Sequence, residues 1–219
     1  VKNHRNGVDN PNAQFQKEIT METALESPIV ADPLRLYDFC PITDGSAALL
    51  FCPVEVAREY TDTFVRVAGV GGATDTHVVH ERADPTTMGG VVESGRQAYD
   101  RSGYEPEDID VAELHDMFTI LEFLQYEDLG FAEKGHAWED AVEGVTARDG
   151  ELPVNTSGGL KSKGHPIGAT GTGQIVEAFK QLRGDAYVQV DDPKYGLTHN
   201  VGGSGGGVTV HILEREGAA

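Results

Sequence analysis

The chain has 219 residues, with 36 Asp and Glu against 17 Lys and Arg, and a formal net charge of -19. Such an acidic surface repels nucleic acid and anionic membranes, so we expect neither as a partner. No stretch approaches the roughly 20 apolar residues of a transmembrane helix, and no signal peptide is visible, so we expect a cytoplasmic protein.

The N-terminal part of the chain is predicted to be largely irregular. Residues 1–26 are polar and predict the end of a helix followed by a surface loop, and residues 27–33 are extended because a residue before Pro avoids the helical region. After a turn at residues 38–45, the apolar run at residues 46–52 predicts a strand buried on both faces. A short helix begins at residues 53–57, with Pro in its first turn.

Strands and helices alternate along the rest of the chain, which is typical of an α/β fold. The predicted strands are residues 64–72, 109–114, 153–156, 196–200 and 208–213, the last two forming a hairpin around a glycine-rich loop at 202–207. The predicted helices are residues 89–102 and 119–128, and residues 175–182 lie on a third helix, which Gly171 and Gly173 allow to start close to other backbone. Residues 132–149 are a charged connecting segment that can be helical in part. We place a domain boundary near Asp62, so that residues 1–62 form the end of one domain and residues 63–219 a second domain.

Two features of the chain indicate its origin. The acidic residues are spread along the whole chain and lysines are few, which favours an acidic surface suited to high salt, and so a halophilic source, over an acidic mesophilic enzyme. The chain starts at Val1 rather than Met, from which we expect a truncated or processed product.

Three clusters could carry chemistry, and each lies where a predicted strand gives way to a loop or helix, the usual place for sites in α/β folds. In the first, Glu-Leu-His-Asp-Met-Phe at residues 113–118, His115 can donate a hydrogen bond to a substrate oxygen or hold a water. In the third, residues 199–207, the backbone N–H groups of a glycine-rich loop can form an oxyanion hole. For the first cluster, the structural alternative is a histidine whose hydrogen bonds are made by local backbone groups. For the third cluster, it is a flexible hairpin loop.

The second cluster, residues 158–171, has the longest glycine pattern. Its glycines let the backbone approach a ligand closely, and Pro166 fixes the backbone next to His165. A histidine held in this way can activate a thiol or a hydroxyl as a general base. The structural alternative is a glycine-rich turn that contains a structural histidine.

No metal or nucleotide site is predicted from the sequence. The histidines are scattered without the spacing of a zinc helix, and Cys40 and Cys52, which also lack zinc spacing, are typical of buried core thiols. Residues 164–168 lack the GK[ST] ending of a P-loop, and the chain has neither a dinucleotide-binding fingerprint nor a GxSxG hydrolase elbow.

The string Gly-His-Pro-Ile-Gly-Ala-Thr-Gly at residues 164–171 closely resembles the GHPxGATG signature of the thiolases. Residues 113–118 are similar to the NEAF motif of that family, in the HDxF form of its sterol-carrier-type and archaeal branches, and residues 200–203 stand where many thiolases have CxGG. Residues 42–50 look like the last strand of the family's N-terminal domain. The resemblance therefore implies the layered α/β/α/β/α thiolase fold, here as the C-terminal domain plus the end of the N-terminal one.

The resemblance also implies roles for individual residues. His165 would be the base that deprotonates the nucleophilic cysteine and would line an oxyanion hole, and His115 would help to bind the thioester oxygen of the enolising acetyl-CoA. Asn200 and Gly202 complete the implied catalytic set, and the backbone of Gly202 would help to form the second oxyanion hole. The implied substrate contacts are Met117 and Phe118 at the acyl pocket, and Ser157, Gly158 and Gly159 along the pantetheine arm.

The chain departs from the family pattern at its cysteines. The family's nucleophilic cysteine has no match here, because Cys40 and Cys52 lie in or beside the wrong strand. The second, acid/base cysteine is also missing, since the two places where the family carries it hold Asn200 and Met117. Either His165 or His115 would then take the proton from the acetyl methyl group, or the protein does not perform that step.

We therefore expect a thiolase, archaeal by resemblance, that interconverts two acyl-CoA molecules with a 3-ketoacyl-CoA plus CoA, with coenzyme A thioesters as substrates and no cofactor. The fragment alone is expected to be inactive, because its own N-terminal half or a complementary subunit would carry the nucleophile. The resemblance also implies a homo-oligomer and a zinc-ribbon/OB-fold acyl-CoA-binding partner. The alternatives are a non-catalytic thiolase-like acyl-CoA-binding or scaffold protein, and a decarboxylating ketoacyl synthase.

Overall fold

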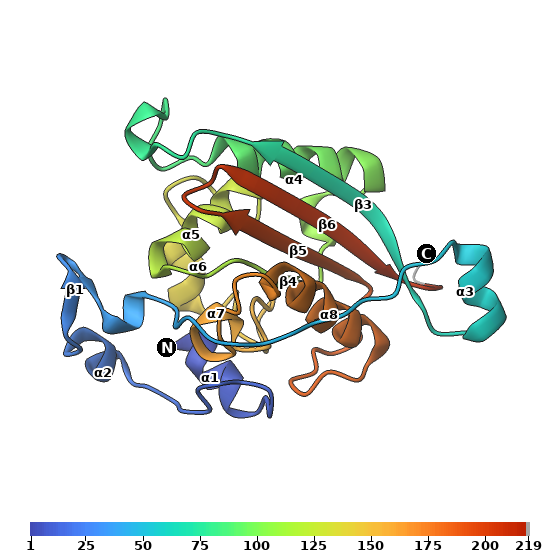
Figure 1. Ribbon diagram of the computed structural model, residues 1–219, viewed down its shortest axis with the longest axis horizontal. Coiled ribbons are helices and arrows are strands. Elements are labelled where there is room, and N and C mark those ends of the chain that lie inside the picture. The colour runs from blue at the N-terminus through green and yellow to red at the C-terminus, as the bar shows by residue number, and fades with distance from the viewer. Residues whose placement is uncertain (218–219) are drawn as a thin grey trace.

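The computed structural model describes residues 1–217, and its elements alternate along the chain as expected for an α/β protein (Figure 1). The α-helices are α1 Lys2–Val8, α2 Met21–Leu25, α3 Val54–Tyr60, α4 Gly89–Ser102, α5 Thr119–Asp128, α6 Ala137–Glu143, α7 Gly159–Ser162 and α8 Thr170–Arg183. The 3-10 helices are η1 Leu36–Asp38, η2 Val79–Glu81 and η3 Pro106–Asp108. The strands are β1 Ile29–Ala31, β2 Leu34–Arg35, β3 Val65–Thr74, β4 Val111–Glu113, β5 Tyr195–Gly202 and β6 Gly207–Arg215.

Four strands form the main sheet, in the order β3-β6-β5-β4. Strands β5 and β6 form the predicted hairpin and β3 pairs antiparallel with β6, whereas β4 runs parallel to β5. The strand predicted at residues 153–156 is reduced to a single bridge between Ala112 and Val154. It is cut short because Asn155 has a φ of 56°, a left-handed conformation that ends a strand.

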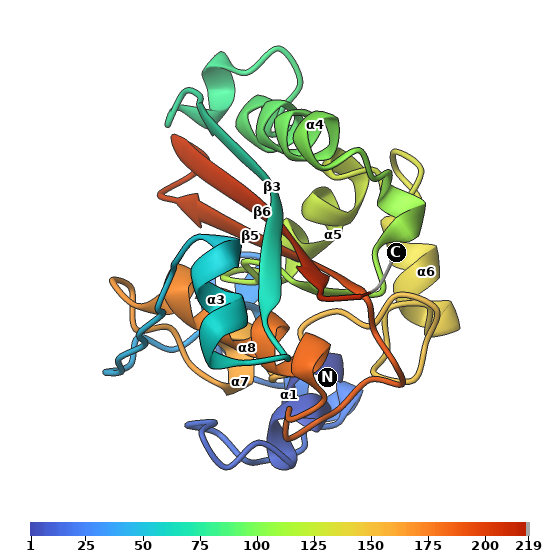
Figure 2. The ribbon, with the colours of Figure 1, turned by 90° about the vertical axis from the view of Figure 1, so that its right-hand side faces the viewer.

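Helices cover both faces of the main sheet. Figure 2 shows α4 and α5 on one side of the sheet and α8 on the other. Alternate residues of β5 face the two layers: Leu197 and Val201 belong to the core shared with α4 and α5, whereas Gly196 lies against Ala178 and Leu182 of α8. The C-terminal end of β4 therefore lies between α5 and α8, and the candidate site is located there.

Helix α4 packs directly on the backbone of β3. A Cβ added at Gly71 would lie 1.7 Å from the carbonyl oxygen of Ser94 on α4, so the close approach depends on glycine. At Gly72, on the same strand, the nearest atom to an added Cβ is 3.9 Å away. The pair offers a matched test of how α4 is held.

We expect Gly71→Ala to lower the free energy of unfolding by about 3 kcal/mol, because the methyl group forces α4 away from the sheet. Gly72→Ala is the control, and its effect should stay within about 1 kcal/mol. Urea unfolding followed by circular dichroism measures both variants. Equal midpoints for the two would contradict the direct packing of α4 on Gly71.

The prediction of a buried strand at residues 46–52 is wrong. These residues form neither helix nor strand, and Leu50 and Phe51 are 95% and 65% exposed. The segment passes α8 in extended form, and a cavity of about 420 Å³ separates part of it from Gly173, Val176 and Lys180. An apolar run becomes a buried strand only beside strands that complete its hydrogen bonds. Among residues 1–217, no strand lies next to this segment.

Other differences are smaller. The polar residues 1–26 contain two helices, α1 and α2, rather than a helix end and a loop. The connecting segment 132–149 contains α6. Across residues 1–217, no helix has the length and apolar character needed to cross a membrane.

Candidate active site

His115 lies just beyond the C-terminal end of β4 and is buried. Its backbone is held by one side chain of α5: the His115 N–H donates to Gln125 Oε1 at 2.9 Å, and Gln125 Nε2 donates to the His115 carbonyl oxygen at 2.8 Å. This paired contact fixes the loop after β4 against α5 and so holds the backbone that carries the His115 imidazole.

His165 comes from the glycine-rich segment before α8, and its ring meets that of His115. The two ring centroids are 5.0 Å apart and the planes cross at 89°. Gly164 has a φ of 114°, so a turn that favours glycine immediately precedes His165. The structure thus brings together the two histidines that the sequence places 50 positions apart.

The hydrogen bonds of His165 leave its Nε2 as a free acceptor. Its Nδ1 lies 2.7 Å from Thr170 Oγ1, and that hydroxyl donates its single proton to the Pro166 carbonyl oxygen at 3.0 Å. Thr170 must therefore accept from His165, which places the ring proton on Nδ1. Burial lowers the pKa of His165, so the ring is neutral at neutral pH and its Nε2 lone pair can take a proton.

His115 has the opposite arrangement. Its Nδ1 lies 3.0 Å from Asn200 Nδ2, and an amide nitrogen can only donate, so Nδ1 accepts and the ring proton is on Nε2. Burial, with smaller contributions from His199 and His165, lowers the pKa of His115 to about 3. The two imidazoles therefore offer one donor and one acceptor, which is what enolisation of a thioester requires.

Asp116, the next residue of the motif, has a structural task. It is buried, and its carboxylate accepts from the N–H groups of Leu160 at 2.6 Å and Lys161 at 3.3 Å, at the start of α7, and from Asn3 Nδ2 at 2.7 Å. Burial, followed by the charge of Glu122, raises the pKa of Asp116 to about 6. Asp116 therefore joins α1, α7 and the loop that carries His115.

Met117 and Phe118 lie against a segment from the N-terminal part of the chain. The Cys40 N–H donates to the Met117 carbonyl oxygen at 2.9 Å, and the rings of Phe39 and Phe118 meet edge to face at 5.2 Å. The same segment forms a bridge between Ile42 and His165. It thus ties together the two loops that carry the histidines, and contact of Met117 and Phe118 with an acyl chain stays a prediction.

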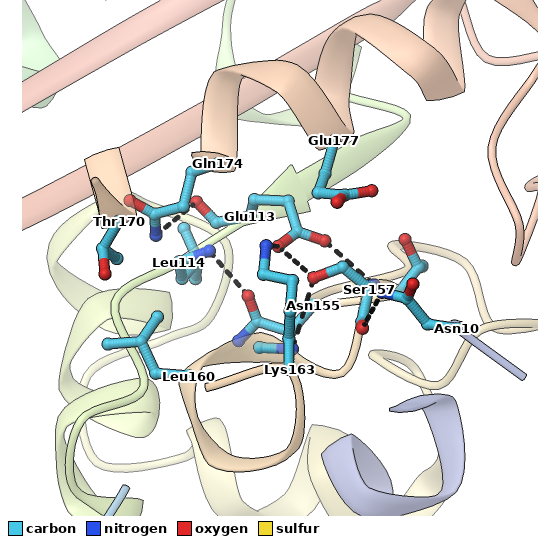
Figure 3. Close-up of polar contacts among 12 residues, drawn as sticks. Asn10, Glu113, Leu114, Asn155, Ser157, Leu160, Lys163, Thr170, Gln174 and Glu177 are labelled. Carbon is cyan, nitrogen blue, oxygen red and sulfur yellow. Dashed lines mark hydrogen bonds and ion pairs between the residues drawn. The ribbon is translucent and has the colours of Figure 1, made fainter. Parts of the chain in front are cut away.

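The residues predicted along the pantetheine arm are buried. Ser157 donates to the Glu113 carboxylate from its N–H at 3.1 Å and its Oγ at 2.7 Å, an arrangement shown in Figure 3. Gly158 lies close to Gly7 of α1, and Gly159 lies against Asp116. The pantetheine role of residues 157–159 stays a prediction, as does the oxyanion role of Gly202, which ends β5 opposite Gly207.

Glu113 is itself buried, and Lys163 Nζ is 3.9 Å from its carboxylate (Figure 3). Burial is the main reason that the pKa of Glu113 is raised to about 7; Glu177 adds to the shift, and Lys163 and Ser157 oppose it. Since the folded state favours the protonated form, Glu113 stabilises the fold below pH 4.5 and loses that contribution as pH rises to about 7.

We expect Glu113→Gln to remove this loss. Between pH 4.5 and pH 7, the free energy of unfolding of the variant should therefore rise by about 3 kcal/mol relative to that of the wild type. Urea unfolding at the two pH values measures the difference. Glu59→Gln, at an exposed position of α3, is the control and should leave the difference unchanged. A constant gap between wild type and Glu113→Gln would show that Glu113 does not titrate in this range.

Two side chains of this site, Gln125 and Gln174, were not predicted from the sequence, and Thr170 and His199 lie in the second and third predicted clusters but were given no role of their own. Thr170 lies inside the glycine-rich string, and Gln174 follows it by one helical turn on the buried face of α8. A polar residue on the buried face of a helix was the available signal. Among the residues that the structure describes, no group of three or more His, Cys, Asp or Glu side chains could hold a metal ion.

Two family descriptions match the chain: "Thiolase C-terminal domain-like" over residues 71–215 and "Thiolase, N-terminal domain" over residues 1–55. An acetyl-CoA acetyltransferase of Methanothermobacter thermautotrophicus is 48% identical over 216 residues, covering 98% of this chain and 56% of that protein. The benzoylsuccinyl-CoA thiolase subunit BbsB of Thauera aromatica is 38% identical over 207 residues, covering 93% and 53%. The chain thus spans about half the length of these curated relatives.

Solved structures give the same picture. The chain is similar to the "Ltp2-ChsH2(DUF35) aldolase" with a TM-score of 0.89 and 28% identity, covering 99% of this chain and 57% of that one. It is also similar to a monomeric SCP2-thiolase like protein type 1 from Mycobacterium smegmatis, with a TM-score of 0.73 over 97% of this chain and 44% of that one. At 20% identity, the second likeness concerns the fold alone.

Proposed function

This chain belongs to the thiolase family, and from that premise we propose that it supplies the two catalytic histidines of an acyltransferase that interconverts two acyl-CoA molecules with a 3-ketoacyl-CoA and free CoA. The observation that carries the proposal is the complementary pair of imidazoles, in which His165 offers a lone pair at Nε2 and His115 offers an N–H at Nε2. A protein that only bound acyl-CoA would gain nothing from this arrangement of protons.

The nucleophile is proposed to be a cysteine supplied from outside these 219 residues, by an N-terminal half or a complementary subunit. Burial raises the pKa of Cys40, the reverse of what an attacking thiolate needs. Cys52 is exposed in the segment that carries no secondary structure, and Cys40 is half-buried, so the prediction that both are buried core thiols is wrong. Neither of them is assigned a chemical role.

In the first half-reaction, His165 Nε2 takes the thiol proton of that cysteine, and the thiolate attacks the carbonyl carbon of an acyl-CoA. The carbon–sulfur bond to CoA breaks, and the protonated His165 returns the proton to the leaving CoA thiolate. An acyl-enzyme thioester and free CoA result, and His165 is neutral again.

In the second half-reaction, His165 Nε2 takes a proton from the methyl carbon of acetyl-CoA, while His115 Nε2–H donates to the oxygen of the forming enolate. The enolate carbon attacks the acyl-enzyme, a carbon–carbon bond forms and the bond to the cysteine sulfur breaks. The cysteine thiolate recovers the proton from His165. We assign both proton transfers to His165 because Asn200 stands where the family has an acid/base cysteine and the low pKa of His115 makes it a weak base.

A non-catalytic acyl-CoA-binding protein is the second candidate, and the observation that favours it is Asn200 in place of a titratable thiol. The similar structure "Ltp2-ChsH2(DUF35) aldolase" contains, by its name, a DUF35 component together with a second component. We propose that this chain likewise assembles with a small acyl-CoA-binding partner of zinc-ribbon/OB-fold type. The homo-oligomer, the halophilic archaeal source and the division at residues 62 and 63 stay predictions.

The test is CoA-dependent cleavage of acetoacetyl-CoA at high salt, for the chain alone and for the chain mixed with its encoded upstream half. We expect activity in the mixture and none in the chain alone. A folded mixture that binds CoA but does not cleave the substrate would replace the enzyme with the second candidate.

A further inference from the structure

Two side-chain amides, the buried Gln174 and the half-buried Asn200, link α8 to the ring of His115. The first of them, Gln174, is 1% exposed and lies beside the Glu113 backbone in Figure 3. Gln174 Nε2 lies 2.9 Å from the carbonyl oxygen of His199 and 3.4 Å from that of Glu113. A carbonyl oxygen only accepts, so these two contacts turn the nitrogen of Gln174 toward the sheet and its oxygen away from it.

The orientation of Gln174 dictates that of Asn200. Gln174 Oε1 lies 2.9 Å from Asn200 Nδ2, and because Oε1 can only accept, the amide nitrogen of Asn200 must face it. The second hydrogen of the same nitrogen then points at His115 Nδ1, 3.0 Å away. Each group in the series therefore fixes the orientation of the next one.

Asn200 alone would not fix which ring nitrogen of His115 carries the proton. The two ends of an asparagine amide have the same shape, and a flipped Asn200 would offer its oxygen to His115, which could then carry its proton on Nδ1. With Gln174 in place, the flip would put Asn200 Oδ1 against Gln174 Oε1, two acceptors with no proton between them. The anchor at the sheet backbone therefore excludes the flip.

We propose that Gln174 is a positioning residue that fixes, through Asn200, which ring nitrogen of His115 carries the proton. Held on Nε2, that proton makes His115 a donor at the site and leaves His165 as the acceptor. The link to catalysis rests on the proposed function, whereas the position of the proton can be measured without any reaction.

The direct test is long-range proton–nitrogen NMR of the ¹⁵N-labelled chain, which distinguishes the two neutral forms of a histidine ring; His115→Gln identifies the signal. We expect the Nε2–H form in the wild type. Gln174→Met keeps the shape but removes the anchor, and we expect His115 to become a mixture of both forms. Gln174→Glu is the matched control: in its protonated form its O–H donates to the His199 carbonyl oxygen and its other oxygen still accepts from Asn200, so the Nε2–H form should persist.

Two results would overturn the proposal: an Nδ1–H form in the wild type, which needs no variant to fold, or an unchanged Nε2–H form in a folded Gln174→Met. A second readout uses the chain with its upstream half. There, Gln174→Met should slow proton exchange at the acetyl carbon by at least about tenfold, with Gln174→Glu restoring it and acyl-enzyme formation unchanged. If no preparation shows thiolase activity while the NMR result holds, the proposed function fails and the role of Gln174 in the proton position stands.

Discussion

His165→Gln is expected to lower kcat for acetoacetyl-CoA cleavage about 1,000-fold in the complete enzyme, because the glutamine has no lone pair that can take a proton at neutral pH. Both half-reactions use His165 Nε2, so acyl-enzyme formation and proton exchange at the acetyl carbon should fall together. Mass spectrometry of the acylated enzyme and solvent-deuterium uptake measure the two steps separately. His80→Gln, in the exposed η2, is the control and should leave both rates unchanged.

The same residue predicts the acidic limb of the pH profile. Burial holds the pKa of His165 below its usual value of 6.5, so the base stays deprotonated as pH falls toward neutral and kcat/KM drops only below pH 6.5. A limb centred above that value would assign the titration to another group. Loss of proton exchange with normal acylation in His165→Gln would remove His165 from the first half-reaction.

His115→Ala is expected to separate the two half-reactions. Without the Nε2–H donor, the enolate oxygen loses its stabilising hydrogen bond, and proton exchange at the acetyl carbon should fall about 100-fold. Acyl-enzyme formation, which uses the lone pair of His165, should change by no more than about threefold. Rapid-quench acylation and deuterium uptake on the same preparation provide the comparison.

Equal losses in both steps of His115→Ala would mean that the ring acts by holding His165 in place. His115→Asn distinguishes this case, because an asparagine side chain keeps an N–H donor. Recovery of exchange in His115→Asn supports a hydrogen-bond role, whereas failure of both variants to exchange, with acylation lost as well, would assign His115 a structural role.

The local pattern of the sequence predicted the helices well. The predicted helices at residues 89–102 and 119–128 have the bounds of α4 and α5, because each carries an apolar face and α4 ends at Gly103 in the left-handed conformation. The hairpin of β5 and β6 was also confirmed, with ends one or two residues longer than predicted. These features are determined by neighbours in the sequence.

The segment at residues 46–52 could not be predicted in the same way. Its composition fits a buried strand, but burial depends on a sheet beside it, which no local pattern reports. The short α7 was missed for a related reason, since it starts at Gly159, where the carboxylate of Asp116 from another part of the chain accepts its first N–H groups.

Within the site, the histidines and Asn200 were found because they lie in strings that resemble a family signature. Gln174, which orients Asn200, was not found, because the two residues are 26 positions apart in the sequence. The contact of Asn200 with His115, 85 positions away, was not predicted for the same reason. The helix that carries residues 175–182 was predicted to start near Gly171 and Gly173, and α8 begins at Thr170, so the helix was anticipated but the hydrogen bonds of Gln174 were not.

The last glycine of the GHPIGATG string couples the helix start to the residue at position 200. A Cβ on Gly171 would lie 3.3 Å from Asn200 Cγ, so a methyl group and the asparagine amide compete for the same volume. We therefore expect positions 171 and 200 to be coupled: a methyl group at 171 would require the Asn200 amide to shift by a few tenths of an ångström, whereas a shorter side chain such as cysteine at 200 leaves more room. The glycine that ends this string thus leaves room for the amide that orients the His115 ring, so the loop and the histidine depend on each other for space as well as for hydrogen bonds.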